Sequence, residues 1–574
     1  MKFIFSIFFL FCLFSLSAQN REHAFLVNEK LGRGINFGNM FEAPSETEWG
    51  NPWLPEYPGM IAKLGFQHVR IPVRWEPEER SSLSFPYTIN PDFLARIQQV
   101  VDSCLDNGLS AIVNMHHHEM LFENPDAQKA RFLAQWKQIS EYFKDYPDEL
   151  LFEILNEPHG NLTAEKWNSF LADALSTIRE DNPDRVVVIG TPDYGGLGGL
   201  SKLKIPDDQN IILTVHYYNP FQFTHQGAEW VDGSNAWLGT KWNDTETERA
   251  VVQNDFAPLK TLEEEQHIPV HIGEFGAYSK ADPVSRKKWT TYLSRYFEMQ
   301  GWSWAYWEFS AGFGIYNPVT KTYNQDLVDA LLHDSIPEPA RYVGTALYSS
   351  DFSQNTSQWN VYTQSDASAI KENSSGNLDV TIVSAGTETW HIQLVKNNVQ
   401  LQAGKKYRVT FVARSDAKRQ ISAYCGQSVT PWSAYSDYNS ISLTDSFAEY
   451  SYVFDMRTTD NSARMVFDLG TSVEDVHFKS IVLESIELQE PSSVQMQKEY
   501  ASTIYPNPAS HQLFVNNLDD FERITLMNLT GQVVLQQTLK QSRNNIDLSR
   551  NPSGIYFVSM SNQNEKYTVK IIKN

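Results

Sequence analysis

The sequence feature that most constrains the fold is a set of eight hydrophobic runs within the first 310 residues, with polar or aromatic residues at their ends. The runs are Leu31–Gly38, Phe66–Trp75, Leu109–His118, Glu149–Glu157, Arg185–Gly190, Ile211–Tyr218, Pro269–Gly276 and Trp302–Phe309. Helix-compatible stretches such as Pro91–Asn107, Lys129–Asp145 and Glu165–Asn182 lie between them. Because strands that alternate with helices form parallel sheets, and eight such units close a sheet on itself, the pattern predicts a (β/α)8 barrel.

The carboxyl ends of the predicted strands carry the candidate site, since strand bodies in such a barrel are packed core. These ends supply Asn36, Arg70, His116, His117, Asn156, Glu157, His216, Tyr218, Glu274 and Trp307. Two carboxylates on different strands are the minimum for cleaving a glycosidic bond: one protonates the leaving oxygen, and the other attacks the anomeric carbon or activates a water. An Asn-Glu-Pro triplet alone is usually a solvated loop, and a glutamate between glycines is usually a turn. Here both motifs occur at strand ends and in barrel order, Glu157 in the triplet and Glu274 between the glycines, and this combination favours catalysis by the two glutamates.

Charge and cysteine content exclude several classes of function. The net charge of -22 argues against nucleic acid as a partner. Cys104 and Cys425 fall in different predicted domains, so the chain is not a disulfide scaffold. Side chains alternate along a strand, so the run His116–His118 cannot direct all three rings at one ion. No zinc or iron–sulfur spacing is present, and we expect neither a metal at the site nor a cofactor.

The N-terminus has the pattern of an export signal. Lys2 supplies the positive start, Phe3–Leu16 is apolar, and small residues follow up to Ala18. We expect residues 1–18 to be a signal peptide. The alternative, a membrane anchor, is disfavoured because the apolar run is too short to span a bilayer comfortably.

Two breaks divide the rest of the chain. Ile336–Pro339 contains two prolines and ends the barrel pattern. Beyond it, short alternating runs such as Leu378–Val383 and Tyr407–Val412 predict a β-sandwich (jelly-roll) module. The second break, Glu490–Ser493, precedes further short strands. We therefore expect a catalytic barrel over 22–338, a β-sandwich over 346–490 and a small all-β domain over 500–574.

The barrel motifs resemble glycoside hydrolase family 5, the cellulase and mannanase family of retaining TIM-barrel enzymes. The resemblance covers about residues 25–335 and rests on Gly34–Asn39, Val69–Val73, Asn114–His117, Leu155–Pro158, His216–Tyr218, Ile272–Gly276 and Trp304–Phe309. It implies Glu157 as the acid/base and Glu274 as the nucleophile. The other roles that it implies are Asn156 on the sugar 2-hydroxyl, Arg70 and Tyr218 around the nucleophile, His216 beside the acid/base, and Trp307 under the cleaved sugar. For His116 and His117 we expect sugar contacts or a core role.

The segment Asn219–Ala228 resembles the endo-β-1,4-glucanase branches of that family, some of whose members also accept mannan. We therefore expect a retaining endo-β-1,4-glucanase that acts as a monomer on β-glucan. The alternatives are an endo-β-1,4-mannanase, a mixed-linkage or xyloglucan hydrolase, and a non-catalytic polysaccharide-binding surface protein. Five tryptophans in predicted loops above the barrel either line flanking subsites or pack those loops: Trp49, Trp53, Trp230, Trp237 and Trp242.

Residues 346–488 resemble the β-sandwich carbohydrate-binding modules of the family 4 and 9 type, most closely at Trp390–Val395 and Leu401–Val409. The candidate sugar contacts are Trp390, Tyr424, Trp432, Tyr435 and Tyr438. The alternative is a spacer with buried aromatics. Modules of this type often hold a structural calcium, but no acidic ligand set is evident here.

Residues 500–574 resemble the C-terminal sorting domain of the type IX secretion system, at Ile504–Ala509, Asn528–Val534, Pro552–Val558 and Lys570–Lys573. The resemblance implies passage through the periplasm, contact with the type IX secretion machinery, and delivery to the medium or the cell surface. A small adhesive β-domain is the alternative.

Overall fold

The computed structural model describes residues 21–353 and 358–490 and, with short gaps, residues 503–573. The predicted signal peptide, residues 1–18, lies outside the described residues. The chain divides into two compact units, Met1–Tyr342 and Val343–Asn574. Among the described residues, none of the helices combines the length and the apolar character that crossing a membrane requires.

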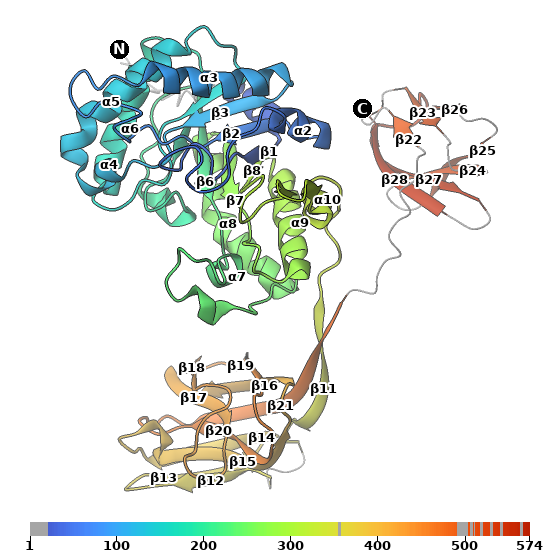
Figure 1. Ribbon diagram of the computed structural model, residues 1–574. Helices are drawn as coiled ribbons and strands as arrows, with labels where there is room; N and C mark the ends of the chain where they lie inside the picture. Colours follow the sequence, from blue (N-terminus) through green and yellow to red (C-terminus); the bar gives the residue numbers. More distant parts are fainter. Residues whose placement is uncertain are drawn as a thin grey trace, which may run out of the picture. The chain divides into compact units, whose positions relative to one another are not determined.

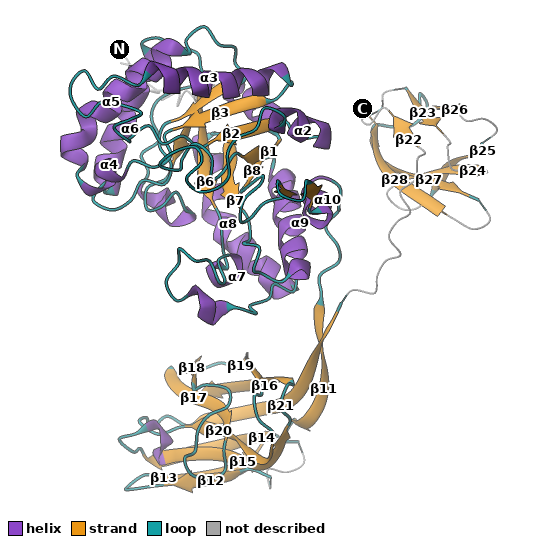
Figure 2. Cartoon of the chain, viewed as in Figure 1, coloured by secondary structure: helices purple, strands orange, loops and turns teal. Residues whose placement is uncertain are grey.

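The first unit is a closed barrel of eight parallel strands, with helices outside them (Figures 1 and 2). The strands are β1 (Arg33–Asn36), β2 (His68–Ile71), β3 (Ser110–Asn114), β4 (Leu150–Glu153), β5 (Val187–Gly190), β6 (Ile211–His216), β7 (Val270–Phe275) and β8 (Ser303–Tyr306). The barrel closes where β1 pairs with β8, for example at Gly34 and Ala305. The predicted (β/α)8 fold is confirmed.

The helices of this unit cover the barrel in sequence order. They are α1 (Glu22–Leu31), α2 (Tyr57–Leu64), α3 (Pro91–Asp106), α4 (Glu119–Glu123), α5 (Pro125–Tyr142), α6 (Ala164–Arg179), α7 (Phe221–Thr224), α8 (Glu246–Gln266), α9 (Pro283–Gln300) and α10 (Gln325–Leu332). Short 3-10 turns, η1 (Leu197–Lys202) and η2 (Ser234–Trp237), and a small hairpin of β9 (Tyr316–Asn317) and β10 (Thr322–Tyr323) complete it.

Helix α3 illustrates why these segments are helical. The side chain of Asn90 accepts the backbone N–H of Asp92, and Pro91 occupies the first turn, where its missing N–H costs nothing. The residues Leu94, Ile97, Val101 and Cys104 recur at helical spacing and are all buried. The helix therefore covers the barrel with one apolar face.

Helix α1 closes the amino-terminal end of the barrel. Its buried residues Ala24, Val27 and Leu31 belong to one apolar cluster with strand residues. The strand members of that cluster are Ile112, Leu151, Val186, Val188 and Ile212. Helix α1 thus packs against the end of the barrel opposite to the carboxyl-terminal ends of the strands, where sites of such barrels lie.

Each strand is shorter than the hydrophobic run that predicted it. The run Glu149–Glu157, for example, forms β4 only as far as Glu153. The residues after Glu153 leave the sheet and form the loop that carries Asn156 and Glu157. Apolar residues extend past the strand because the loops at the mouth of the barrel are themselves buried.

The break Ile336–Pro339, which ends the barrel pattern in the sequence, is held against the barrel. Arg249 donates a hydrogen bond to the carbonyl of Pro337 at 2.8 Å, and the N–H of Ala340 donates to the carbonyl of Asp244 at 2.9 Å. Strand β11 (Arg341–Ser350) begins at the next residue.

The second unit contains a β-sandwich of two antiparallel sheets. One sheet has the order β13-β14-β21-β16-β19, with β11 also paired to β21, and the other has the order β12-β15-β20-β17-β18. Their bounds are β12 (Asn360–Thr363), β13 (Ser368–Ser374), β14 (Asn377–Ser384), β15 (Ile392–Leu401), β16 (Lys406–Ser415), β17 (Arg419–Gly426), β18 (Asn439–Leu443), β19 (Ala448–Asp455), β20 (Asp460–Asp468) and β21 (Val476–Gln489). Alternate residues of both sheets, among them Val409, Phe411 and Phe467, share one buried core.

The C-terminal residues form two further antiparallel sheets, β22-β23-β26 and β25-β24-β27-β28. The strands are β22 (Thr503–Tyr505), β23 (Gln512–Asn516), β24 (Arg523–Asn528), β25 (Val533–Thr538), β26 (Arg543–Asp547), β27 (Gly554–Ser561) and β28 (Lys566–Lys573). They have a hydrophobic core of their own, which includes Leu513, Leu526 and Val558. The predicted all-β modules after the barrel are confirmed. Pro506–Pro508 and Leu529–Gly531, parts of the sorting motifs, lie outside the described residues.

Candidate active site

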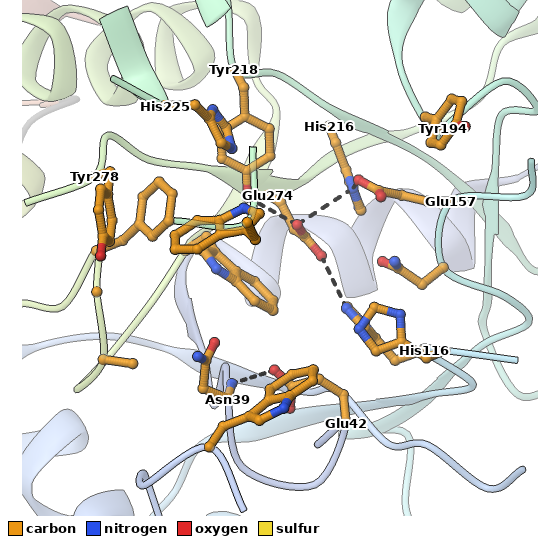
Figure 3. Close-up of a pocket in the computed structure, with 18 of the residues that line it drawn as sticks. Asn39, Glu42, His116, Glu157, Tyr194, His216, Tyr218, His225, Glu274 and Tyr278 are labelled. Carbon is orange, nitrogen blue, oxygen red and sulfur yellow. Dashed lines mark hydrogen bonds and ion pairs between the residues drawn. The ribbon is translucent and has the colours of Figure 1, made fainter. Parts of the chain in front are cut away.

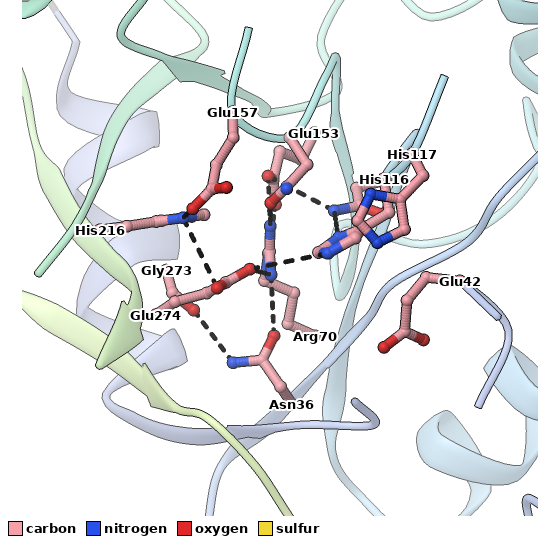
Figure 4. Close-up of polar contacts among 12 residues, drawn as sticks. Asn36, Glu42, Arg70, His116, His117, Glu153, Glu157, His216, Gly273 and Glu274 are labelled. Carbon is pink, nitrogen blue, oxygen red and sulfur yellow. Dashed lines mark hydrogen bonds and ion pairs between the residues drawn. The ribbon is translucent and has the colours of Figure 1, made fainter. Parts of the chain in front are cut away.

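A fully buried arginine organises the mouth of the barrel. Arg70, on β2, donates two hydrogen bonds to Glu153, at 2.5 and 2.7 Å, and one to Glu274 at 2.7 Å. It also donates to Asn36 at 2.9 Å and to Asn156 at 2.7 Å (Figure 4). Burial lowers the pKa of Arg70, but the neighbouring carboxylates outweigh burial and raise it. The guanidinium is thus the buried counterion of two carboxylates.

Glu153 is a member of the site that the strand-end pattern did not predict. Its pKa is raised by burial and lowered more strongly by the charge and hydrogen bonds of Arg70, so it falls below the ordinary value. A signal was present in the sequence, because a carboxylate inside the apolar run Leu150–Leu155 requires a buried partner.

Glu274, near the end of β7, is held from two sides. Besides Arg70, the hydroxyl of Tyr218 donates to it at 2.9 Å. Rings of two histidines approach the same carboxylate, His216 at 3.6 Å and His116 at 4.0 Å. Burial raises the pKa of Glu274, the charges of His216 and Arg70 lower it, and the net direction in the free site is upward.

Glu157 faces Glu274 across the pocket (Figure 3). Its carboxylate lies 2.8 Å from Nδ1 of His216, and its side chain is 29% exposed, against 6% for Glu274. One carboxylate oxygen of each glutamate and a ring nitrogen of His216 all lie within 4.8 Å of one another. Burial raises the pKa of Glu157, and the hydrogen bond and charge of His216 lower it to below its ordinary value. The three groups are close enough to titrate as one unit.

His216 completes this unit from β6. Burial lowers its pKa, but the charges of Glu274 and Glu157 and the bond to Glu157 raise it above the ordinary value. The imidazole therefore keeps its second proton to higher pH than a free histidine, and it lies within hydrogen-bond distance of Glu157.

The site opens into a cavity of about 1200 Å³. Trp307 lines it and stacks on His116, with ring centroids 5.5 Å apart and an interplanar angle of 14°. His117, beside His116, meets Trp49 edge to face at 6.0 Å. Burial lowers the pKa of His116 far below the ordinary value, so this histidine is neutral. Eight of the ten predicted strand-end residues line the pocket, Arg70 lies one contact behind it through Glu274, and Asn36 lies behind Arg70.

Aromatic side chains extend the pocket on both sides of the carboxylates. The lining includes Trp49, Tyr194, Phe221, Trp230, Tyr278 and Phe313. Of the five loop tryptophans, Trp49 and Trp230 line the cavity, whereas Trp53 and Trp242 are buried in the core. The two alternatives for these residues, subsite lining and loop packing, thus each apply to part of the set.

Two buried carboxyls near the cavity were not predicted. Glu42 accepts the backbone N–H groups of Asn39 and Met40, and burial raises its pKa to about 8. Glu308 accepts three backbone N–H groups of the loop after β8, at 2.7 to 3.0 Å, and burial raises its pKa to about 7. Each fixes the loop that carries it, through contacts that a strand-end pattern does not reveal.

In the β-sandwich, a row of polar side chains crosses one sheet. Gln393 donates to Asp468 at 2.7 Å and to the hydroxyl of Tyr424 at 3.2 Å. Further along β20, the guanidinium of Arg464 lies 4.6 Å from the ring of Trp432. Neighbouring residues in these strands face the core, so the row lies on the outer face of the sheet.

The five aromatic candidates of the sandwich do not form one cluster, although the rings of Tyr424 and Tyr438 meet edge to face at 4.8 Å. Tyr424 and Trp432 lie along this row, whereas Tyr435 packs on the core and donates to Asp460 at 2.9 Å. Trp390 belongs to a 3-10 turn, η3 (Thr389–His391), and is 43% exposed. Gln393, Arg464 and Asp468 were missed because nothing in a polar residue of an alternating strand distinguishes a binding face from a solvated one.

The fold and the site define a class of protein: (β/α)8-barrel enzymes with two facing carboxylates at the carboxyl-terminal mouth of the barrel. Residues 33–312 match the family described as Cellulase (glycosyl hydrolase family 5). Endoglucanase A of Ruminococcus albus is 31% identical over 53% of this chain and 90% of its own length. The chain belongs to glycosyl hydrolase family 5.

Other relatives support the same assignment. Endoglucanase H of Acetivibrio thermocellus is 36% identical over 53% of this chain, but the chain spans only 33% of that protein. Structures of Thermotoga maritima Cel5A, with mannotriose in one and cellobiose in another, are 48% identical and cover 54% of this chain and 99% of theirs, with a TM-score of 0.53.

The two trailing segments match separate families. Residues 344–475 match a family described as Carbohydrate binding domain, and residues 503–574 match the Secretion system C-terminal sorting domain. The expected resemblances are confirmed, and the sorting domain makes this a secreted protein, delivered to the cell surface or the medium.

Proposed function

We propose that this chain is a retaining endo-β-1,4-glucanase. The observation that carries the proposal is the pair Glu157 and Glu274, whose carboxylate oxygens lie within 4.8 Å of each other. Retaining glycosidases need their two carboxyls about 5–5.5 Å apart, whereas inverting enzymes need ~6.5–9.5 Å to admit a water. The short separation supports direct attack by one carboxylate on the sugar.

In the first step Glu274 attacks the anomeric carbon while Glu157 gives its proton to the leaving oxygen. A bond forms between that carbon and the Glu274 carboxylate, and the glycosidic bond breaks. In the second step Glu157 takes a proton from a water, which displaces Glu274 from the sugar. Arg70 and Tyr218 hold Glu274 in place, because both donate to its oxygens.

The first step requires Glu157 protonated and Glu274 ionised, and substrate binding supplies this difference. A sugar in the pocket removes the remaining water from Glu157, whose side chain is 29% exposed. The side chain of Glu274 is only 6% exposed, so binding changes its solvation less. Loss of water raises the pKa of Glu157, so the proton passes to it from His216. The two hydrogen bonds to Glu274 keep that carboxylate ionised.

The sugar 2-hydroxyl meets Asn156 in this proposal. Its Oδ1 accepts from Arg70 at 2.7 Å, so the amide NH2 is the group that faces a sugar oxygen. Glucose and mannose differ at the 2-position, and Thermotoga maritima Cel5A has been crystallised with cellobiose and with mannotriose. An endo-β-1,4-mannanase, or a mixed-linkage or xyloglucan hydrolase, is therefore the second candidate.

The remaining segments serve delivery and targeting. We propose a signal peptide over 1–18, a catalytic barrel over 22–338, a carbohydrate-binding module over 346–490 and a sorting domain over 500–574 that engages the type IX secretion machinery. The module binds polysaccharide through the outer sheet face that carries Tyr424 and Trp432, and the enzyme acts as a monomer.

The test is a panel of soluble polysaccharides with a reducing-sugar readout: carboxymethylcellulose, barley glucan, glucomannan, galactomannan, xyloglucan and xylan. We expect the highest activity on the β-glucans, the β-anomer as the first product by proton NMR, and no activity in Glu274→Gln with binding retained. Activity only on galactomannan would transfer the proposal to mannan. An α-anomer first product would refute retention, and inactivity on every glycan would favour the non-catalytic binding protein.

A further inference from the structure

The turn after β5 lies directly behind Glu157. Its residues Asp193, Tyr194 and Gly195 have φ of +59°, +65° and +66°, so three consecutive residues are left-handed. Non-glycine residues adopt this conformation at a cost, and they persist in it only where the surroundings impose it. Glu157 itself has φ of +43°. Left-handed backbone thus occurs both at Glu157 and in the turn that lies behind it.

Backbone hydrogen bonds connect this turn to the Glu157 loop and to strand β6. The N–H of Tyr194 donates to the carbonyl of Pro158, the residue after Glu157, at 3.1 Å. The carbonyl of Gly195 accepts the N–H of His216 at 2.9 Å. The turn therefore bridges the loop that carries Glu157 to the strand that carries its hydrogen-bond partner.

Gly195 is the point of closest approach. A Cβ atom at this position would lie 3.1 Å from Cγ of Glu157 and 3.5 Å from Nδ1 of His216. Carbon atoms in good contact lie about 3.5–4.0 Å apart, so a methyl group here would displace the Glu157 side chain. The backbone of Gly195 forms the wall against which that side chain rests.

We infer that Gly195 is a positioning residue for the glycosidic reaction: its bare backbone sets the direction in which Glu157 presents its carboxyl to the leaving oxygen. The inference rests on the proposed function, since it assigns a role in the step where Glu157 gives up a proton. A proton transfer of this kind requires heavy atoms about 2.6–3.2 Å apart, so a displacement of a few tenths of an ångström is enough to impair it.

The test compares Gly195→Ala with Gly198→Ala. Gly198 lies three residues further along, its φ is not left-handed, and nothing approaches a Cβ there within 4 Å. Two substrates are used: cellotetraose, whose leaving sugar needs protonation, and 2,4-dinitrophenyl β-cellobioside, whose leaving group does not. Thermal midpoints of both variants are measured alongside.

We expect Gly195→Ala to lose at least about 30-fold in kcat/KM on cellotetraose and less than about 3-fold in kcat/KM on the dinitrophenyl glycoside, because this ratio reports the first step, in which only cellotetraose needs a proton from Glu157. The basic limb of its pH profile on cellotetraose should also move, because the displaced carboxyl is no longer in the same contact with His216. Gly198→Ala should match the wild type. Equal losses on the two substrates, or no loss on either, would overturn the inference.

A second variant covers the case in which Gly195→Ala does not fold. The hydroxyl of Thr191 donates to the carbonyl of Gly196 at 2.9 Å and closes the turn, so Thr191→Val loosens it without adding an atom beside Glu157. A loss confined to cellotetraose supports the positioning role, and a uniform loss or none refutes it. A wild-type protein that hydrolyses neither substrate would refute the proposed function instead.

Discussion

Replacing Arg70 by lysine should separate its two tasks, structural and catalytic. The guanidinium makes five hydrogen bonds to four side chains, whereas an ammonium has three donors. At least two bonds are lost, and at roughly 1.5 kcal/mol each the free energy of unfolding falls by about 3 kcal/mol. For a domain of this size that corresponds to a thermal midpoint roughly 5–10 °C lower.

The catalytic effect follows from Glu274. Burial raises the pKa of this carboxyl, and the charge and hydrogen bond of Arg70 oppose the rise. Lysine keeps the charge but loses the guanidinium hydrogen bond to Glu274, so the pKa of Glu274 moves further upward. A carboxyl that ionises at higher pH shifts the acid limb of the kcat/KM profile to higher pH. With the nucleophile also less well held, we expect kcat/KM at neutral pH to fall by at least ~100-fold, or about 2.7 kcal/mol.

Arg185→Lys is the matched control. Arg185 is also buried, but it precedes β5 and donates to Asn182 at 2.8 Å and to backbone carbonyls, including that of Leu150 at 2.7 Å. It should lose comparable stability while kcat/KM and the acid limb stay unchanged. The reasoning is wrong if Arg70→Lys keeps its acid limb, or if both variants lose activity only in proportion to the unfolded fraction.

Four further outcomes are expected. A chain ending at Ala340 should cleave soluble glucan at close to the wild-type rate and lose activity mainly on insoluble polymer, where tethering raises local concentration; equal losses on both would contradict it. Trp432→Ala should weaken retardation of the isolated module in affinity gels containing β-glucan, and a module that no polysaccharide retards is a spacer. Burial raises the pKa of Asp468 from 3.8 to about 6, so the protonated carboxyl stabilises the fold below about pH 4, and this contribution, at most ~3 kcal/mol, is lost as pH rises through 6. Asp468→Asn should therefore flatten the decline in the thermal midpoint of the sandwich between pH 4 and 8. An unchanged slope would count against this account. Deleting residues 500–574 should leave the activity of the purified enzyme unchanged while the protein accumulates in the periplasm of its host. If the truncated protein still reaches the cell surface or the medium at normal levels, residues 500–574 are not the sorting signal.

The barrel could be predicted from the sequence because its signals are local. Each strand of a parallel barrel is apolar on both faces, so a run such as Ile211–Tyr218 stands out against the amphipathic helices beside it. Strand ends were predicted less well. The run Glu149–Glu157 continues past β4 because the loop that follows is buried, and burial alone does not distinguish a strand from a packed loop.

The sandwich was harder to predict at its edges. Strands β12 and β18 have only four and five residues, which is too short for an alternating pattern to stand out. The motif Trp390–Val395 begins before its strand, since Trp390 lies in η3 and β15 starts at Ile392. The hydrophobic pattern specifies which residues enter the core, and it does not specify where backbone pairing starts.

The candidate site shows the same division. Residues at strand ends, such as Glu274 and His216, were predictable because topology brings all eight ends together. Glu42 and Glu308 were not, because each accepts N–H groups of its own irregular loop, whose path leaves no hydrophobic pattern. Gly195 was not, because it meets Glu157 from a different loop. A buried carboxyl that binds backbone N–H groups has no sequence signature, because any segment can supply the N–H groups.

Helix α1 has a consequence for the order of events during export. It precedes the rest of the barrel in the chain, yet its partners come late: Arg21 donates to the carbonyl of Gln266 at 2.6 Å, and Asn28 to that of Val270 at 3.0 Å. Ser303 then donates to Asn28 at 2.6 Å. A chain that crosses a membrane amino end first therefore leaves the polar contacts of this helix incomplete until Ser303, 275 residues beyond Asn28, has followed it. The apolar face of the helix meets its partners earlier, from Ile112 to Ile212, so the helix docks in stages as the barrel forms around it.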